Sequence, residues 1–205
     1  MIRLYSDRCS GNAYKILLAL AQLGRPFEEI AIDIFRGESR TPAFFTKNPD
    51  GRIPVLETDG GRFLAESNAI LAYLAEGTPL LPSDPLERAQ VLAWLFFEQN
   101  QIEPNLGTAR YWMLTGKNRG LEAVQAQKTG ASERALETLA RGLDGKTFLV
   151  AERYTIADVG VYAYAHLAPD IGLALPPPVA AWAARVEGVP GWFPGPAPYP
   201  PHARA

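Results

Sequence analysis

The side chains with the clearest chemical potential lie between Asn48 and Ser67, where the chain reads NPDGRIPVLETDGGRFLAES. Glu66 and Ser67 stand just before an apolar pattern of helical spacing, so the Ser67 hydroxyl is predicted to cap a helix. The free N–H groups of a helix N-terminus favour an anion, and the adjacent Glu66 carboxylate can accept an ammonium. The pair suits the amino-acid end of a zwitterionic ligand, although a capped helix without a ligand also explains it.

A second chemical feature is Ile53-Pro54, at the mouth of the strand predicted over 55–57. Proline has no N–H for a sheet ladder, so it belongs at an edge or where the backbone must stay free. We expect a cis peptide bond here, a form that about 5–6% of X-Pro bonds adopt. The backbone of Ile53 then suits a peptide that lies along it like an added strand.

Ser10-Gly11-Asn12 places a hydroxyl and an amide at the start of a predicted helix. A helix N-terminus and a direct hydrogen-bond donor both stabilise a thiolate. Ser10 and Asn12 are therefore the candidate catalytic residues, and simple capping of the helix is the alternative.

The first 77 residues are predicted to build the sheet that positions these groups. Alternating apolar residues indicate strands, and apolar residues at helical spacing indicate helices. A crossover helix between the first two strands implies that they are parallel. In chain order we expect a strand at 2–5, a helix at 13–23, a strand at 27–34, a polar loop at 35–40, a short helix at 42–48, a hairpin of 55–57 and 62–64, and a helix from Ser67.

After a proline-dense segment at 78–85 the chain shows no convincing strand. The Thr155-Ile156-Ala157-Asp158 segment is a capping box in front of an apolar helix, and it serves folding. The predicted helices run from 86 to about 113 with a bend near Pro104, from 121 to about 143, from 159 to about 167, and from 176 to 186, followed by a proline-rich tail that packs across the surface or frays.

The Ile53-Pro54 turn, the hairpin and Glu66-Ser67-Asn68-Ala69-Ile70 resemble the glutathione-binding domain of the glutathione transferases. The resemblance extends over nearly the whole chain. It implies a thioredoxin-like β-α-β-α-β-β-α domain at 1–77, a linker at 78–85 and an all-α helical-bundle domain at 86–205. In that family the matching proline is cis, and the matching Glu-Ser pair holds the γ-glutamyl end of glutathione.

The resemblance also implies glutathione as co-substrate, a homodimer, and further contacts. Arg52 stands where Gln, Lys or Arg often holds the glycyl carboxylate, with Arg40 and Lys47 as candidate second cations. Ile53 would contact the ligand through its backbone, Tyr111 and Trp112 are expected to line the electrophile pocket, and Glu98 is a weaker candidate for a contact across the dimer interface.

The catalytic loop resembles that of bacterial members with Ser or Thr two residues before Asn, which supports Ser10 and Asn12. Tyr5 falls too early to match the tyrosine-type members. Cys9 is out of register with the cysteine-type members by about three residues, so it is either a bystander or a redox partner.

Composition and charge argue against nucleic-acid-binding, membrane-bound and metal-dependent proteins. With 205 residues, 47% hydrophobic and a net charge of −2, the chain can bury a core but offers no basic field for nucleic acid or an anionic membrane. One cysteine suits a reducing compartment, and without an apolar leader or span we expect a cytoplasmic protein. His166, expected to be packed, and His202, expected to be solvated, are far apart, so no metal is expected.

The leading interpretation is a glutathione S-transferase that activates the glutathione thiol for attack on an electrophilic small molecule or a peroxide. One alternative is a glutathione-dependent disulfide-bond reductase, with or without Cys9. The other is a non-catalytic interaction module that has kept the fold.

Overall fold

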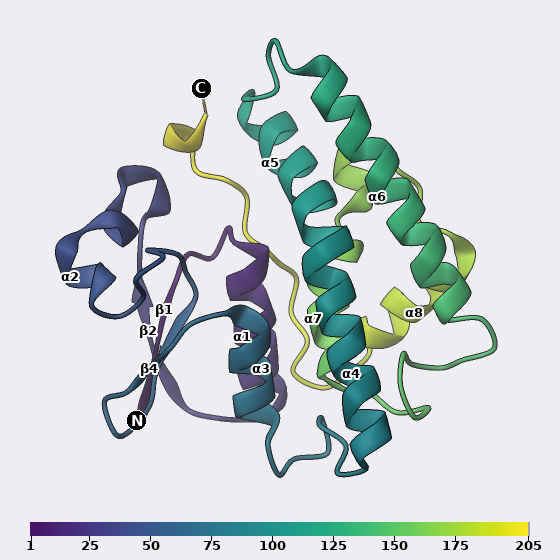
Figure 1. Ribbon diagram of the computed structural model, residues 1–205, viewed down its shortest axis with the longest axis horizontal. Coiled ribbons are helices and arrows are strands. Elements are labelled where there is room, and N and C mark those ends of the chain that lie inside the picture. The colour runs from purple at the N-terminus through teal and green to yellow at the C-terminus, as the bar shows by residue number, and fades with distance from the viewer. Residues whose placement is uncertain (205) are drawn as a thin grey trace.

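The first part of the chain folds in the predicted βαβαββα order, and an all-helical part follows it (Figure 1). The computed structural model describes residues 1–204. The elements of the first part are β1 (Ile2–Ser6), α1 (Gly11–Gln22), β2 (Phe27–Ala31), α2 (Pro42–Phe45), β3 (Val55–Glu57), β4 (Phe63–Leu64) and α3 (Ser67–Ala75). Those of the second part are α4 (Pro85–Phe97), α5 (Thr108–Thr115), α6 (Glu122–Gly142), α7 (Ile156–Ala165) and α8 (Pro177–Glu187).

The mixed sheet has the strand order β2-β1-β3-β4. β1 and β2 are parallel, as the crossover helix α1 predicts, and β3 pairs antiparallel with both β1 and β4. Leu4 and Leu56 join the main core with α1 and α3, whereas Tyr5 and Val55 alternate to the other face and pack on Phe44 of α2. The two faces are thus covered by different helices.

The segment predicted as a polar loop at 35–40 contains two 3₁₀ turns, at Ile34–Arg36 and Glu38–Arg40. The Asp33 carboxylate accepts hydrogen bonds from the backbone N–H groups of Phe35 and Arg36, at 3.0 and 3.1 Å, and so caps the first turn. These turns fix the positions of two residues of the site described below, Phe35 and Arg40.

A single helical path runs from α4 through a π-helical segment, Glu98–Gly107, into α5. Pro104 lies inside that segment, so it does not end the helix. Proline lacks the N–H that an α-helix needs and its ring crowds the carbonyl one turn back, and the wider π-helical turn accommodates both effects. Within residues 1–204, no helix is both long and apolar enough to cross a bilayer.

Helix α7 lies at the centre of the molecule, and all of its residues are buried. The predicted capping box is confirmed, since the Asp158 carboxylate accepts from the Thr155 N–H at 2.9 Å. Asp158 also accepts from the N–H of Leu149 and from the indole of Trp182 in α8, at 3.0 and 2.9 Å. One buried carboxylate therefore starts α7 and ties α8 to it.

The C-terminal tail returns from α8 across the first part, beside α1 (Figure 1). Tyr14 donates to the carbonyl of Phe193 at 2.7 Å, and Ala197 N–H donates to the carbonyl of Arg8 at 2.8 Å. His202 is exposed, as expected, and it also lies 2.8 Å from the Asp33 carboxylate, because the short turn Pro201–Ala203 brings it back to the sheet-containing part.

His166 is packed, as predicted. Its ring stacks on Tyr162, with ring centres 4.3 Å apart, and its two nitrogens contact the carbonyls of Tyr162 and Gly195. Burial lowers the pKa of His166, which favours the neutral ring. The residue joins α7 to the tail and has no free nitrogen for catalysis.

Candidate functional site

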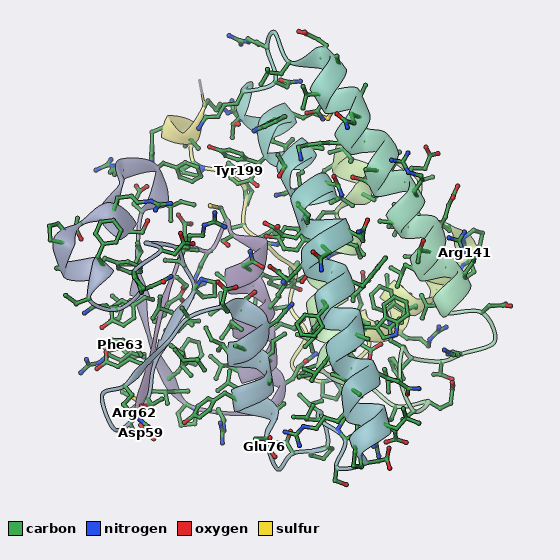
Figure 2. All side chains as sticks on the ribbon, viewed as in Figure 1. Asp59, Arg62, Phe63, Glu76, Arg141 and Tyr199 are labelled. Atoms are coloured by element: carbon green, nitrogen blue, oxygen red, sulfur yellow. The ribbon has the colours of Figure 1, made fainter. Side chains whose placement is uncertain are left out.

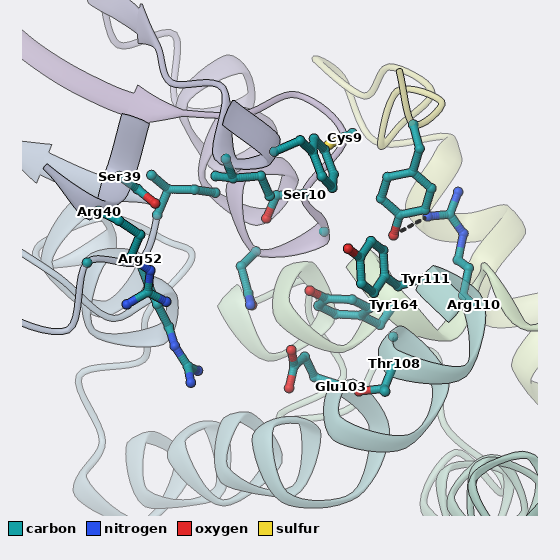
Figure 3. A pocket seen from close by; sticks show the side chains of 18 residues that line it. Cys9, Ser10, Ser39, Arg40, Arg52, Glu103, Thr108, Arg110, Tyr111 and Tyr164 are labelled. Carbon is teal, nitrogen blue, oxygen red and sulfur yellow. Dashed lines mark hydrogen bonds between the residues drawn. The ribbon is translucent and has the colours of Figure 1, made fainter. Parts of the chain in front are cut away.

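A cavity of about 330 Å³ opens between the two parts of the molecule (Figure 3). Its walls come from the loop before α1, the two 3₁₀ turns, the segment before β3, the π-helical segment with α5, α7, and the tail. The lining residues are Cys9, Ser10, Gly11, Asn12, Ile34, Phe35, Ser39, Arg40, Gly51, Arg52, Ile53, Glu103, Gly107, Thr108, Arg110, Tyr111, Tyr164 and Tyr199.

A smaller cavity of about 60 Å³ shares Asn12, Arg52, Ile53 and Glu103 with the larger one. Pro54, Glu66, Ser67, Asn48 and Gln99 complete its lining. The two cavities share a wall and form one continuous site, which brings together the predicted site residues except Trp112, Lys47 and Glu98. Only an elongated ligand fills both ends.

Ser10 is the N-cap of α1, with an extended backbone at φ −83° and ψ 125°. Its hydroxyl oxygen accepts a hydrogen bond from the Ala13 N–H at 3.3 Å, so the hydroxyl hydrogen is left to donate into the cavity. The positive end of the α1 dipole lies at the same place. An anionic sulfur at this position would gain both interactions.

Ser67 was expected to be the N-cap of α3, and this prediction was wrong. Ser67 is the first helical residue, Glu66 precedes it, and no side chain within residues 1–204 caps the helix. The reason is that the Ser67 hydroxyl is engaged elsewhere: it donates to Asn12 Oδ1 at 3.0 Å. The N–H groups at the start of α3 therefore remain directed at the smaller cavity, where they can meet an anion.

Glu66 has a left-handed backbone, with φ 69° and ψ 110°. A residue with a side chain adopts this conformation at a cost of about 1–3 kcal/mol, and such residues concentrate at functional sites. The conformation sets the Glu66 carboxylate at the wall of the smaller cavity, next to the uncapped end of α3. A positive and a negative binding position thus lie side by side.

Below these residues lies a fully buried ion pair, Lys15 with Glu98, at 2.6 Å. Lys15 also donates to Ser67 Oγ and Asn68 Oδ1, both at 3.4 Å, and Asn68 donates to Glu98 at 3.1 Å. Burial lowers the pKa of Lys15, and the attraction of Glu98 opposes that shift. The pair joins α1 to the π-helical segment, and the hydrogen bond from Lys15 helps to hold the Ser67 side chain in place.

The expectation that Glu98 reaches across a dimer interface was wrong. The Glu98 side chain has no exposed surface in the single chain, because it faces Lys15 across the contact between the two parts. Its second carboxylate oxygen, Oε1, has no hydrogen-bond partner within residues 1–204. Glu98 lines neither cavity, so it is not placed to meet a ligand amine there.

At the entrance to β3, the Ile53-Pro54 peptide bond is cis, as predicted. Asn48 holds the preceding loop, because its amide donates to the carbonyl of Arg52 at 2.9 Å. Arg40 donates to the carbonyl of Asp50 at 2.6 Å and Arg52 lies 2.8 Å from the Asp50 carboxylate. These contacts hold two guanidinium groups at one end of the larger cavity (Figure 3).

Two further predicted residues lie away from the cavity. Lys47 sits over the rings of Tyr5 and Phe63, on the opposite face of the sheet, and is not among the lining residues. Trp112 was expected to line the pocket with Tyr111, but its ring lies under Lys128 of α6. Successive helical residues point about 100° apart, and this step turns Trp112 from the cavity wall toward α6, whereas Arg110 and Tyr111 line the cavity.

Cys9 is 3% exposed, and its thiol lies 3.0 Å from the Asp7 carboxylate. Burial and this carboxylate both raise the pKa of the Cys9 thiol. A thiol in this state is a poor nucleophile, since the thiolate is the reactive form. The geometry thus favours a structural Cys9 and argues against a redox role.

Sequence reasoning missed several lining residues, among them Glu103, Arg110, Tyr164 and Tyr199. Burial raises the pKa of Glu103, and the nearby Glu98 carboxylate adds to the effect. Tyr164 fits where it does because two glycines face its ring: a Cβ on Gly11 or Gly107 would lie 2.6 or 2.8 Å from it. No local motif marks these residues, because tertiary packing alone brings them together.

The site holds no obvious metal position. Within residues 1–204, no group of three or more His, Cys, Asp or Glu side chains is arranged to bind a metal ion. The polar groups that converge are hydroxyls, amides, guanidinium groups and helix N-termini. These groups bind organic anions and zwitterions.

Comparison with known proteins agrees with this chemistry. Residues 1–76 match the family model "Glutathione S-transferase, N-terminal domain". The chain is 34% identical to glutathione S-transferase F14 of Arabidopsis thaliana, over 94% of this chain and 81% of that protein. Its fold is similar to the structure of a possible glutathione S-transferase from Rhodopseudomonas palustris, with a TM-score of 0.90 and 44% identity over 94% and 97% of the two chains.

A third comparison concerns a bound ligand. A glutathione transferase from Pseudomonas putida, solved with one glutathione disulfide bound per subunit, superimposes with a TM-score of 0.81. The two sequences are 27% identical, over 93% of this chain and 88% of that one. A relative of the same fold thus binds a glutathione derivative.

The buried ion pair gives a testable prediction for stability. Lys15→Met leaves the Glu98 charge buried without its partner, and we expect a loss of about 3–5 kcal/mol in the free energy of unfolding. Adding Glu98→Met should recover much of that loss, because an apolar pair replaces a charged one. Urea denaturation of the parent, both single variants and the double variant measures the coupling. Strictly additive losses would show that the two charges do not stabilise each other.

Proposed function

The chain belongs to the glutathione S-transferase family, and from this premise we propose that it binds glutathione in the joined cavities and activates its thiol for attack on an electrophile. The observation that carries the proposal is the shared cavity wall. Ser10 at the start of α1 lines the same continuous site as Ile53, Glu66 and Ser67. A thiol anchored through its peptide is thereby presented to a hydroxyl donor and a helix N-terminus.

The proposed ligand position follows the charges of the site. The γ-glutamyl carboxylate would meet the uncapped start of α3 and the Ser67 hydroxyl, which would turn from Asn12 Oδ1 to the ligand, with the ammonium near Glu66. The peptide portion would run along the backbone of Ile53, before Pro54. The glycyl carboxylate would pair with Arg52 and Arg40 at the other end. Each end of the peptide then faces a group of opposite charge.

In the proposed reaction the protein supplies position and electrostatics, and glutathione supplies the nucleophile. The Ser10 hydroxyl donates to the sulfur, and the α1 dipole favours its negative charge, so the thiol releases its proton to water. The Asn12 carbonyl oxygen faces Ser67, which leaves the Asn12 amide N–H to donate to the ligand. The thiolate then forms a bond to the electrophilic carbon, or to a peroxide oxygen, and the leaving group departs with the bonding electron pair.

A second candidate function is glutathione-dependent disulfide reduction. The observation that favours it is the Pseudomonas putida relative with bound glutathione disulfide. In this chain such a reaction would use the glutathione thiol and not Cys9, whose thiol is buried and hydrogen-bonded to Asp7. A non-catalytic interaction module is the remaining alternative, and binding of neither form of glutathione would support it.

The first measurement is isothermal calorimetry with reduced glutathione and with its disulfide. We expect reduced glutathione to bind with a Kd between micromolar and low millimolar. Ser67→Ala should weaken binding by about 1–3 kcal/mol, because a charged hydrogen bond is lost. A clear preference for the disulfide would favour the reductase, and binding of neither form would leave the interaction module. Trp112→Phe, outside the cavity lining, serves as the matched control.

The catalytic role of Ser10 predicts a change in pH dependence. Ser10→Ala removes the donor to the thiolate, so we expect the pKa of the bound thiol to rise by roughly one unit. A raised pKa leaves less thiolate near neutrality, so kcat/KM should fall by about tenfold at pH 6.5 and approach the parent value at high pH. The pH profile of conjugation checks this, and Ser10→Thr should retain the parent profile. If the parent and Ser10→Ala gave the same pH profile of kcat/KM, Ser10 would have no role beyond capping α1.

We also propose a homodimer. Large apolar side chains are exposed on α3 and α4, which face the same side of the molecule in Figure 1: Tyr73 is 47% exposed, Leu92 36% and Phe96 64%. A charge at the most exposed of them, in Phe96→Glu, should convert the dimer to a monomer in sedimentation velocity. Met113→Glu, at an exposed apolar position on α5, should leave the dimer intact. A monomeric parent protein would refute the proposal.

A further inference from the structure

The larger cavity has a third guanidinium group, Arg110, at the end opposite Arg40 and Arg52 (Figure 3). Arg110 lies on α5 and is 6% exposed. Its Nε donates to the Asp170 carboxylate at 2.6 Å, and its Nη1 donates to the Tyr199 hydroxyl at 3.3 Å. A guanidinium group has five N–H donors, so these two contacts leave donor capacity at the cavity wall.

The charges around Arg110 do not cancel at this end of the cavity. Asp170 pairs with Arg110 Nε, but it is not among the lining residues and 41% of its side chain is exposed, so its carboxylate lies outside the cavity. Among residues 1–204, Glu103 is the only carboxylate that lines the cavity, against the three guanidinium groups of Arg40, Arg52 and Arg110. Once glutathione occupies Arg40 and Arg52, Arg110 is the cation that remains for a second substrate.

Aromatic rings surround the same end. Tyr111 and Tyr199 have ring centres 5.5 Å apart, and Phe35 lies 6.2 Å from each. Tyr199, labelled in Figure 2, comes from the tail and lies at the seam between the sheet-containing part and α5. Flat rings pack best against flat, polarised partners, through offset or edge-to-face contacts. The walls therefore select a planar conjugated molecule over a flexible aliphatic one.

We infer that the electrophile is a planar aromatic compound that carries a carboxylate, with its ring against Phe35, Tyr111 and Tyr199 and its carboxylate on Arg110. The inference rests on the proposed glutathione conjugation. In the corresponding reaction the thiolate sulfur forms a bond to an activated ring carbon, and the bond from that carbon to a halide breaks. The halide leaves with the bonding electron pair, and the thiol proton goes to water. Arg110 acts on binding and orientation, not on the proton.

The test compares 4-chloro-3,5-dinitrobenzoate with the neutral 4-chloro-3,5-dinitrobenzamide. Both lose chloride from the same ring position, and kcat/KM for each is divided by its uncatalysed rate constant with glutathione, which removes the difference in intrinsic reactivity. We expect the parent to favour the carboxylate by about tenfold or more, as a charge-assisted hydrogen bond implies. Arg110→Met should reduce the ratio to near one, and Arg110→Lys should keep part of it.

Asp170→Asn is the matched control, because it removes the ion pair of Arg110 and keeps the guanidinium group. We expect this variant to retain or increase the preference for the carboxylate. Loss of the preference in Asp170→Asn as in Arg110→Met would mean that the ion pair and not the cation matters, and would overturn the inference. Equal normalised kcat/KM values in the parent would overturn it as well.

Calorimetry separates this inference from the proposed function. The glutathione conjugates of the two compounds are titrated into the parent and into Arg110→Met without turnover. The parent should bind the carboxylate conjugate about tenfold more tightly than the amide conjugate, and Arg110→Met should bind both alike. Turnover of the amide with no carboxylate preference would refute the inference alone. Absence of turnover with a preserved preference in binding would refute the proposed reaction and support the Arg110 subsite.

Discussion

The buried ion pair of Lys15 and Glu98 is the interaction on which the site depends. Two charges with no exposed surface meet at 2.6 Å across the contact between the sheet-containing part and the helical part. A buried charge without a partner costs several kcal/mol, so neither part can shift relative to the other without a large penalty. Because Lys15 also contacts Ser67, the same interaction fixes the hydroxyl that lies against the proposed ligand.

The two ends of the site are built by different means. The proposed glutathione end uses features of the backbone: the uncapped start of α3, the start of α1 and the cis bond before Pro54. Backbone groups at helix ends vary little with side-chain changes, so this end suits a constant co-substrate. The other end is made of side chains from α5, α7 and the tail, which are free to vary with the electrophile. That division explains why one fold can serve many second substrates.

The tail completes the second end and also holds the molecule together. It is bonded to the first part through Tyr14 and Asp33 and to the second through His166 and Arg110. Tyr199 thus reaches the cavity from a segment whose described residues, up to 204, form no helix longer than a single turn. The position of the Tyr199 ring therefore depends on tail contacts before and after it in the sequence, at Ala197 and His202.

The sequence by itself determined the order of strands and helices, the cis proline, the capping box at Thr155 and the group formed by Ser10, Asn12, Ile53 and Ser67. These follow from local periodicity, turn chemistry and a recognisable motif, all of which act over a few residues. Only the tertiary structure decided that Ser67 bonds to Asn12 and does not cap α3, that Glu98 is buried on Lys15, that Trp112 faces α6, and that Arg110 and Tyr199 lie together. Such contacts join residues far apart in sequence, and their free energies depend on burial and on the choice of partner, which no local pattern encodes.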